Sequence, residues 1–231
     1  MKQPTLSQRL ERVAAHVPAG ARLADIGSDH AQLPVALVAR GQVLAAIAGD
    51  AAAMPCQAAR QCVEEHELQA RIEVRLANGL AAIAPEDDIT AISLCGMGGE
   101  TIRDILAAGR QRLTGRERLI MQPNGGEQPL RQWLMDNGYR IVEEEVLREH
   151  RYDYEIIVAE ASGPVSYSPR ELYFGPLQLQ ARTPAFITKW QRVLRQRQQT
   201  LHNFAHARQA VAEAKREEIS REARWISELL A

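Results

Sequence analysis

The sequence predicts an α/β fold built on a seven-stranded, mostly parallel sheet that finishes in an antiparallel hairpin. Seven short runs rich in apolar residues lie between about residues 5 and 160, and helix-length stretches separate the first five, which is the rhythm of βαβ units. The last two runs are joined only by the polar segment REHRYD, so they should pair antiparallel. The runs are 21–27, 43–50, 71–77, 89–96, 118–124, 139–147 and 154–160.

Size and composition are those of a folded globular protein. The chain has 231 residues, of which 45% are hydrophobic and 25% charged. No apolar run reaches the roughly 18 to 20 residues that span a bilayer, and the first residues lack the apolar core of a signal peptide. We therefore predict a cytoplasmic protein without a membrane partner. The three cysteines form no CxxC pair, and no metal site is expected.

The last third of the chain changes character. Residues 161–185 carry four prolines and are predicted to be a linker after a first domain at 1–160. Residues 186–231 contain no proline or glycine, and apolar residues recur there at helical spacing. This stretch is too long for one globular helix. It predicts a coiled-coil-like helical hairpin that turns near residues 200–206.

Polar or glycine-rich residues follow each of the first five predicted strands. In an open parallel sheet, ligands bind beyond the carboxyl ends of the strands, where the strand order reverses. The residues at these ends are Asp25, Gly27, Ser28, Asp29 and His30 after the first strand, Asp50 after the second, Asn78 and Gly79 after the third, Gly96, Met97 and Gly98 after the fourth, and Gln122, Pro123 and Asn124 after the fifth. Singly, each of these segments is also compatible with an ordinary turn or helix cap.

The first of these turns lacks the glycines of a dinucleotide site. Gly27 is followed by Ser-Asp-His where two more glycines would let backbone amides approach a pyrophosphate. A ligand without pyrophosphate, such as S-adenosylmethionine, needs only a tight turn and polar groups, and acidic side chains suit its ammonium and sulfonium charges. Asp50 stands 23 residues beyond Gly27, where a carboxylate commonly accepts the ribose hydroxyls. Asn78 is well placed for an adenine edge.

The formal net charge of −1 argues against a surface that coats a polyanion, but two basic clusters are candidates for local phosphate binding. One cluster is Arg110, Arg112, Arg116 and Arg118, and the other is Lys189, Arg192, Arg195 and Arg197. Either cluster is also compatible with an ordinary solvated face.

Five helix-separated strands followed by a hairpin are typical of the Rossmann-like, class I methyltransferases. Within that pattern, the chain resembles the bacterial tRNA (adenine(22)-N1)-methyltransferase family, TrmK, over nearly its whole length. The motifs that carry the resemblance are, in order, ADIGSDHAQLP, AIAGD, NGL, CGMGGETIRDIL, RLIMQPN, LRQWLMDNGY, YEIIVAE and ELYFGP. The family also appends a coiled-coil-like part to its methyltransferase domain.

The resemblance implies methyl transfer from S-adenosylmethionine to N1 of an adenine in tRNA. Residues 27–30 would then line the methionyl end of the cofactor, with Asp50 at the ribose and Asn78 at the adenine. Residues 96–98 would shape the space between donor and target base, bordered by residues 122–124. We further predict that Asp29 orients the donor and that Asn124 hydrogen-bonds the base. Candidate RNA contacts are Tyr152 and Tyr154 for stacking and Arg110, Arg112 and Arg116 for phosphates.

Two other functions stay open on the sequence alone. A methyltransferase of the same fold could act on a small molecule or a protein, with the helical tail serving dimerisation. A non-catalytic RNA-binding or scaffold protein could keep the fold without the chemistry, and it would then not bind the donor.

Overall fold

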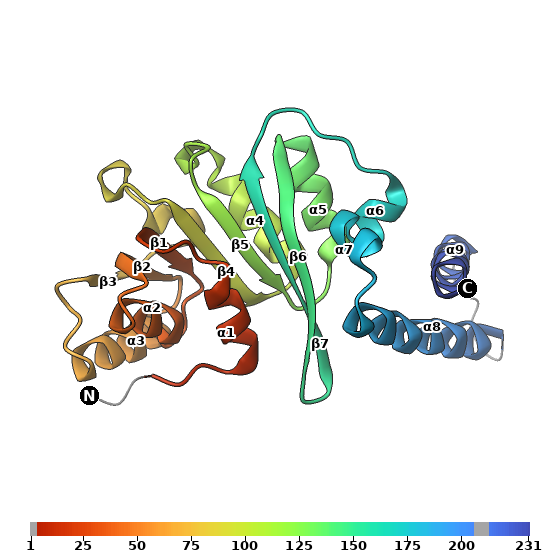
Figure 1. The fold of residues 1–231 in the computed structure, drawn as a ribbon, viewed down its shortest axis with the longest axis horizontal. Helices are drawn as coiled ribbons and strands as arrows, with labels where there is room; N and C mark the ends of the chain where they lie inside the picture. The colour runs from red at the N-terminus through yellow and green to blue at the C-terminus, as the bar shows by residue number, and fades with distance from the viewer. Residues whose placement is uncertain (1–3, 206–212) are drawn as a thin grey trace.

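One seven-stranded sheet organises the chain in the computed structural model, which describes residues 4–205 and 213–231 (Figure 1). The strands are β1 Ala21–Ile26, β2 Val43–Asp50, β3 Ile72–Leu76, β4 Ala91–Met97, β5 Arg118–Pro123, β6 Tyr139–Glu149 and β7 Tyr152–Ala161. Their order is β3-β2-β1-β4-β5-β7-β6. Strands β1 to β5 are parallel neighbours, whereas β7 pairs antiparallel with both β5 and β6. The predicted mostly parallel sheet with a terminal antiparallel hairpin is therefore confirmed.

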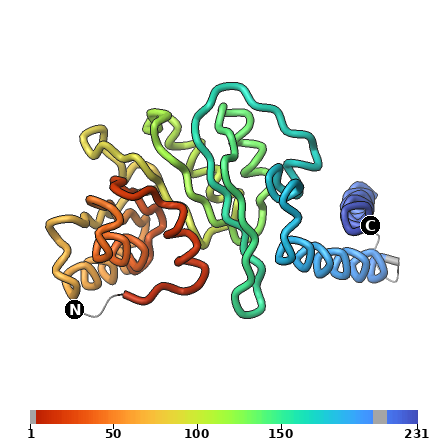
Figure 2. The backbone as a smooth tube through the Cα atoms, in the orientation of Figure 1, coloured from red at the N-terminus to blue at the C-terminus, as the bar shows by residue number. Residues whose placement is uncertain are grey.

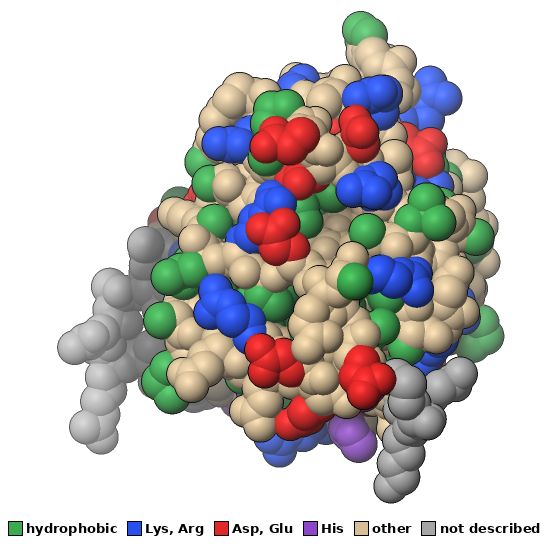
Figure 3. All heavy atoms as spheres, turned by 90° about the vertical axis from the view of Figure 1, so that its left-hand side faces the viewer, with side chains coloured by type: hydrophobic (Ala, Val, Ile, Leu, Met, Phe, Trp, Pro, Cys, Tyr) green, Lys and Arg blue, Asp and Glu red, His purple; other side chains and the backbone are tan. Residues whose placement is uncertain are grey.

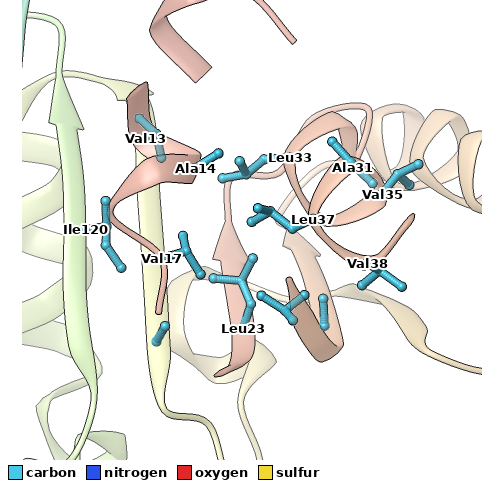
Figure 4. Packing of buried hydrophobic residues seen from close by; sticks show 14 of the residues in the cluster. Val13, Ala14, Val17, Leu23, Ala31, Leu33, Val35, Leu37, Val38 and Ile120 are labelled. Carbon is cyan, nitrogen blue, oxygen red and sulfur yellow. The ribbon is translucent and has the colours of Figure 1, made fainter. Parts of the chain in front are cut away.

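Helices cover both faces of the sheet, because the connections change face where the strand order reverses: those between β1, β2 and β3 run over one face, and those from β4 onward over the other. The helices of this part are α1 Gln8–Ala15, α2 Gln32–Ala39, α3 Ala53–Glu65, α4 Gly99–Ala108 and α5 Glu127–Asp136, with short 3-10 turns η1 Gly79–Ala82, η2 Pro85–Asp87 and η3 Arg110–Arg112. One core layer packs α1, α2 and α3 against the sheet, and the other packs α4 and α5. Figure 4 shows the first layer, with Val17 between Ile120 of β5 and Leu23 of β1.

The predicted linker is partly helical. It contains α6 Pro169–Phe174 and α7 Pro176–Ala181, each of which begins with a proline at its first position. A proline there lacks only an amide hydrogen that would have no helical partner, so it starts a helix readily. Phe174 is buried in one apolar cluster with Phe186 and Trp190, which belong to the long helix α8 Pro184–Ala205. The segment 161–185, predicted to be a linker, therefore contains two short helices.

Two long helices complete the described chain, as predicted. They are α8 Pro184–Ala205 and α9 Glu213–Leu230, and they share an apolar cluster in which Ile226 of α9 is buried. The turn predicted near 200–206 does not fall within 200–205, because α8 stays helical through Ala205. Residues 206–212 lie outside the described part of the chain, and His206 is among them. No helix of residues 4–205 or 213–231 is both long and apolar enough to cross a bilayer.

The β6–β7 hairpin extends beyond the rest of the sheet, between α1 on one side and α8 on the other (Figure 2). On the α1 side, the Gln8 amide donates to Glu149 with 2.7 Å between N and Oε1. On the α8 side, Arg192 donates to Asp153 with 2.9 Å between Nε and Oδ2. The hairpin therefore stands between the N-terminal helix and the C-terminal helices, and a different cavity lies on each side of it.

Candidate functional site

A cavity of about 630 Å³ lies at the carboxyl edge of the sheet. It is centred on the neighbouring strands β1 and β4, between which the strand order reverses. This is the crevice in which open α/β sheets bind ligands. The predicted site residues that line it are Asp25, Gly27, Ser28, Asp29, His30, Asp50, Asn78, Gly79, Gly96, Met97, Asn124 and Tyr154. Residues that follow five different strands are thus brought to one cavity.

Asp25 forms the buried floor of this cavity. Only 5% of the residue is exposed, and both carboxylate oxygens accept hydrogen bonds from serine hydroxyls. Ser28 donates to Oδ2 and Ser93 to Oδ1, each at 2.6 Å. Burial raises the pKa of Asp25 above its ordinary value, although the two hydroxyls and the nearby Arg9 oppose the shift. A carboxylate in this position can stabilise a cationic ligand group.

The turn after β1 is held in an unusual backbone conformation. Gly27 has φ of +73°, and the non-glycine residues Asp29 and Ala31 have φ of +53° and +54°. Non-glycine residues in the left-handed region cost free energy and occur most often at functional sites. Asp50 supports the turn because its Oδ2 accepts from the Asp29 amide at 3.4 Å. The segment that replaces the usual glycine-rich loop is therefore shaped by the end of β2.

The turn after β3 needs a glycine for reasons of space as well as conformation. Gly79 has φ of +55°, and a Cβ there would lie 2.9 Å from Cγ2 of Ile105. Because Ile105 and Asn78 both line the cavity, the glycine lets the chain pass close to α4 while the Asn78 amide stays at the cavity wall. Asn78 is in the place where the sequence predicts an adenine contact.

The loops after β4 and β5 are locked together. The Asn124 side chain donates to the Gly96 carbonyl with 2.9 Å between Nδ2 and O, and the Asn124 amide donates to the Met97 carbonyl at 2.7 Å. The Gly99 amide donates to the Gly125 carbonyl at 2.7 Å, and a Cβ on Gly99 would lie only 2.0 Å from the Gly126 oxygen. These hydrogen bonds hold the two glycine-rich loops, residues 96–99 and 124–126, together beside the cavity, and we call this arrangement the loop clasp.

Arg9 is a site residue that the sequence reasoning missed. It comes from α1 and lines the cavity, where Nη1 donates to Oε1 of Gln122 at 2.5 Å. Its guanidinium carbon lies 5.5 Å from the centroid of the Tyr154 ring. A single arginine in an N-terminal amphipathic helix gives no sequence signal of its own. Thr101 and Ile105 of α4 complete the wall and were also missed.

Comparison with known proteins decides which family the chain represents. The family model described as TrmK, tRNA (adenine(22)-N(1))-methyltransferase, matches residues 23–228. The chain belongs to the TrmK family. A Bacillus subtilis (strain 168) protein named tRNA (adenine(22)-N(1))-methyltransferase is 38% identical over 213 residues, which cover 90% of this chain and 89% of that protein.

Solved structures agree with TrmK membership. The crystal structure of the B. subtilis m1A22 tRNA methyltransferase TrmK is 35% identical, covers 99% of this chain and all of its own (100%), and has a TM-score of 0.89. A Streptococcus pneumoniae protein solved in complex with S-adenosyl-L-methionine is 42% identical, with a TM-score of 0.89 and coverage of 98% and 100%. The predicted Rossmann-like methyltransferase fold, the enzyme class and S-adenosylmethionine as the cofactor are thereby confirmed for this TrmK-family chain.

Several predicted site residues of this TrmK protein do not line the cofactor cavity. Gln122 is fully buried behind it and hydrogen-bonds three residues that line it, namely Arg9, Gly96 and Asn124. Pro123 ends β5, and Gly98 caps α4. Tyr152 lines a second cavity on the α8 side of the hairpin. These four residues support the loops or face a neighbouring surface, and their predicted contacts with ligand stay predictions.

The arginines before β5 lie at the opposite, amino edge of the sheet. Arg112 donates to the Ile83 carbonyl, and the Arg110 guanidinium carbon lies 5.9 Å from the centroid of the Tyr139 ring. Arg116 lies in the same loop, and Arg118 pairs with Glu143 and Glu160. The geometry therefore gives no support to a phosphate contact by these arginines beside the target base. Among residues 4–205 and 213–231, no group of three or more His, Cys, Asp or Glu side chains could hold a metal ion.

Proposed function

We propose that this protein transfers the methyl group of S-adenosylmethionine to N1 of adenine 22 in tRNA. The observation that carries the proposal is the convergence of Asp25, Asp50 and Asn78 on one cavity whose far wall is the clasp of the two glycine-rich loops. The TrmK family description names this reaction. A tRNA substrate also implies that the enzyme works in the cytoplasm.

The residues of the cavity fit the cofactor that the family uses. Three carboxylates, those of Asp25, Asp29 and Asp50, line it, which suits a ligand with ammonium and sulfonium charges better than a dianionic phosphate. Asp50 at the end of β2 would accept the ribose hydroxyls, and the Asn78 amide would meet the adenine edge. Ser28, Asp29 and His30 would hold the methionyl end, and their backbone is already fixed by the turn after β1.

The acceptor adenine would enter on the side of the loop clasp. Met97 lies close to Gly27, since a Cβ on that glycine would lie 3.2 Å from both Sδ and Cε of the methionine. Met97 therefore separates the turn that holds the donor from the loop that carries Asn124. Asn124 has one amide hydrogen engaged with the Gly96 carbonyl and accepts from Gln122 at 3.0 Å, which leaves its second hydrogen for the base. Tyr154 offers a ring at the rim of the same space.

The cofactor, when bound, supplies an electrophilic methyl group on a sulfonium, which the neutral lone pair of adenine N1 can attack without a general base. The protein's contribution is then mainly positioning, which can lower a barrier by up to about 7–11 kcal/mol. The locked loops serve this purpose, because Asn124 donates to two main-chain carbonyls of the loop after β4, to Gly96 from its side chain and to Met97 from its main-chain amide. N1 lies on the Watson–Crick edge, so a paired adenine has to leave its stack to reach the cavity.

RNA contacts are expected near the hairpin and α8 and not at the end of the molecule that carries β3 and α3. Figure 3 shows that end, where basic and acidic side chains are interspersed without a patch of one sign. Phosphate binding needs basic side chains that are not neutralised by neighbours.

Two assays test the proposal against the alternatives. Calorimetry with S-adenosylmethionine should show binding, and absence of binding would favour a non-catalytic scaffold. Incubation of the protein with labelled donor and unmodified tRNA, followed by nucleoside analysis, should give N1-methyladenosine. Donor binding without any label in tRNA would favour a methyltransferase that acts on a small molecule or a protein.

A further inference from the structure

A second cavity adjoins the cofactor cavity on the other side of the β6–β7 hairpin. Its volume is about 680 Å³, and it lies between the loop that starts at Asn124, the beginning of β7 and the first turns of α8. Asn124 and Tyr154 line both cavities. A polynucleotide whose base reaches the first cavity would therefore pass directly over the second.

An exposed aromatic ring stands at the entrance of the second cavity. Tyr152 is 52% exposed, which is unusual for a large aromatic residue in this chain. It lies two residues before Tyr154 on β7, so both side chains are on the same face of the strand. Their ring centroids are 6.2 Å apart and the rings are tilted by 50°. Tyr152 lines the second cavity alone and Tyr154 lines both, which is a suitable arrangement for two successive bases.

A cation without a partner lies next to this ring. The Arg151 guanidinium carbon is 5.2 Å from the Tyr152 centroid, and within residues 4–205 and 213–231 no carboxylate pairs with Arg151. The acidic Asp153 nearby is neutralised by Arg192 and Arg148. Lys189, deeper in the cavity, pairs with Glu155. Lys189 also lies 3.6 Å from Glu127, which lines the same cavity. The charge at the entrance that no carboxylate of the described residues pairs with is therefore that of Arg151, which suits a phosphate.

We propose that this second cavity binds the nucleotide adjacent to the target adenine in the RNA, with its base against Tyr152 and its phosphate at Arg151. The inference rests on the proposed function, because that function brings an RNA strand to Asn124. Stacking on a tyrosine ring tolerates any base. The subsite therefore adds affinity and fixes the position of the target without reading sequence.

The test measures binding, so that it does not depend on catalysis. The dissociation constant of end-labelled tRNA is measured by fluorescence anisotropy at one fixed salt concentration, for wild type, Tyr152→Ala and Tyr152→Phe. Three RNAs are compared: intact tRNA and two versions with an abasic nucleotide immediately 5′ or 3′ of the target adenine. We expect one abasic RNA to bind wild type about tenfold more weakly than intact tRNA.

The variants decide whether the lost affinity comes from Tyr152. Tyr152→Ala should bind intact tRNA about tenfold more weakly and lose nothing more with that abasic RNA, whereas Tyr152→Phe should behave as wild type. For the arginine, the dissociation constant of intact tRNA is measured at several salt concentrations. Arg151→Ala should lower the dependence of affinity on salt by the equivalent of about one phosphate. Arg140→Ala, at an exposed site on the far end of the hairpin, should leave it unchanged. The proposal would be overturned if Tyr152→Ala bound intact tRNA with wild-type affinity. It would also be overturned if the loss of affinity in Tyr152→Ala multiplied with the loss caused by each of the two abasic nucleotides.

The two proposals fail in different ways. If the cavity proposal is wrong, Tyr152→Ala binds intact tRNA as wild type does, or its loss of affinity multiplies with the loss caused by each abasic nucleotide. Wild type still produces N1-methyladenosine in that case. If the proposed function is wrong, wild type produces no N1-methyladenosine, and the binding measurements with the abasic RNAs still show whether the second cavity holds a nucleotide.

Discussion

The side chain of Asn124 donates a hydrogen bond to the main-chain carbonyl of Gly96, with 2.9 Å between Nδ2 and O. This bond joins the loop after β5 to the loop after β4, and the Asn124 amide reinforces it through the Met97 carbonyl. The residue predicted to hydrogen-bond the base is thus also the residue that fixes the loop around that base. Its removal should disturb position as well as binding.

Asn124→Ala should lower turnover about ten- to hundredfold with little change in donor affinity, because misplacement of reacting groups by about 1 Å costs on the order of a hundredfold. Turnover is measured with labelled donor and tRNA, and donor affinity by calorimetry. Asn137→Ala is the matched control, since Asn137 also donates to a main-chain carbonyl, that of Trp133 at 2.8 Å, but at the other end of α5. Wild-type turnover in Asn124→Ala would remove the positioning role.

The neighbouring glycines Gly98 and Gly99 should respond very differently to alanine. A Cβ on Gly99 would collide with the Gly126 carbonyl, so we expect Gly99→Ala to lower the free energy of unfolding by about 1–3 kcal/mol or more. Gly98 has φ of −65°, and its nearest neighbour, Thr101 Oγ1, would lie an ordinary 3.7 Å away. Gly98→Ala should cost less than about 1 kcal/mol. Urea denaturation compares the two, and equal losses would argue against the clasp.

Asp25 should make the stability of the protein depend on pH. Burial raises its pKa in the folded state, so the folded protein binds this proton more tightly than the unfolded chain does. Stability from this group is present at acid pH and is lost as the pH rises through the interval between the unfolded and folded pKa. Asp25→Asn should therefore match wild type at acid pH and gain on it toward neutrality, measured by urea denaturation across that range. A difference in unfolding free energy between Asp25→Asn and wild type that stays the same at every pH would contradict this interpretation.

A buried ionic network joins the sheet to the C-terminal helices. Arg131 of α5 is fully buried and donates to Glu144 of β6 and Glu155 of β7, and Lys189 of α8 also pairs with Glu155. Arg131→Met leaves two carboxylates buried without that partner, which should cost about 3–5 kcal/mol of unfolding free energy. Arg140→Met, at an exposed position of β6, should stay within about 0.5 kcal/mol of wild type. Similar losses of unfolding free energy in Arg131→Met and Arg140→Met would show that the network does not couple the sheet to the C-terminal helices.

The convergence of the strand ends on one cavity was predictable because a parallel sheet collects the ends of its strands at one edge. Asp25, Asp50 and Asn78 are far apart in sequence but follow successive strands, so the alternation of strands and helices was enough to bring them together. The hairpin was predictable for a similar reason, because REHRYD is too short to cross the sheet.

What the sequence did not indicate has equally local causes. Arg9 could not be found because an N-terminal helix can pack anywhere on the sheet, and its position is decided by tertiary contacts such as Gln122. The prolines at 169 and 176 were read as linker residues, yet each begins a helix. The arginines before β5 were grouped by density alone, although a loop that precedes a parallel strand lies at the edge away from the ligand.

The central claim is that adenine 22 of tRNA receives the methyl group at N1. The most direct test compares an unmodified tRNA transcript with the same transcript carrying guanine at position 22, each incubated with labelled S-adenosylmethionine and then digested to nucleosides. We expect label in N1-methyladenosine from the first RNA and none from the second. Equal labelling of both transcripts, or no label in either, would contradict it.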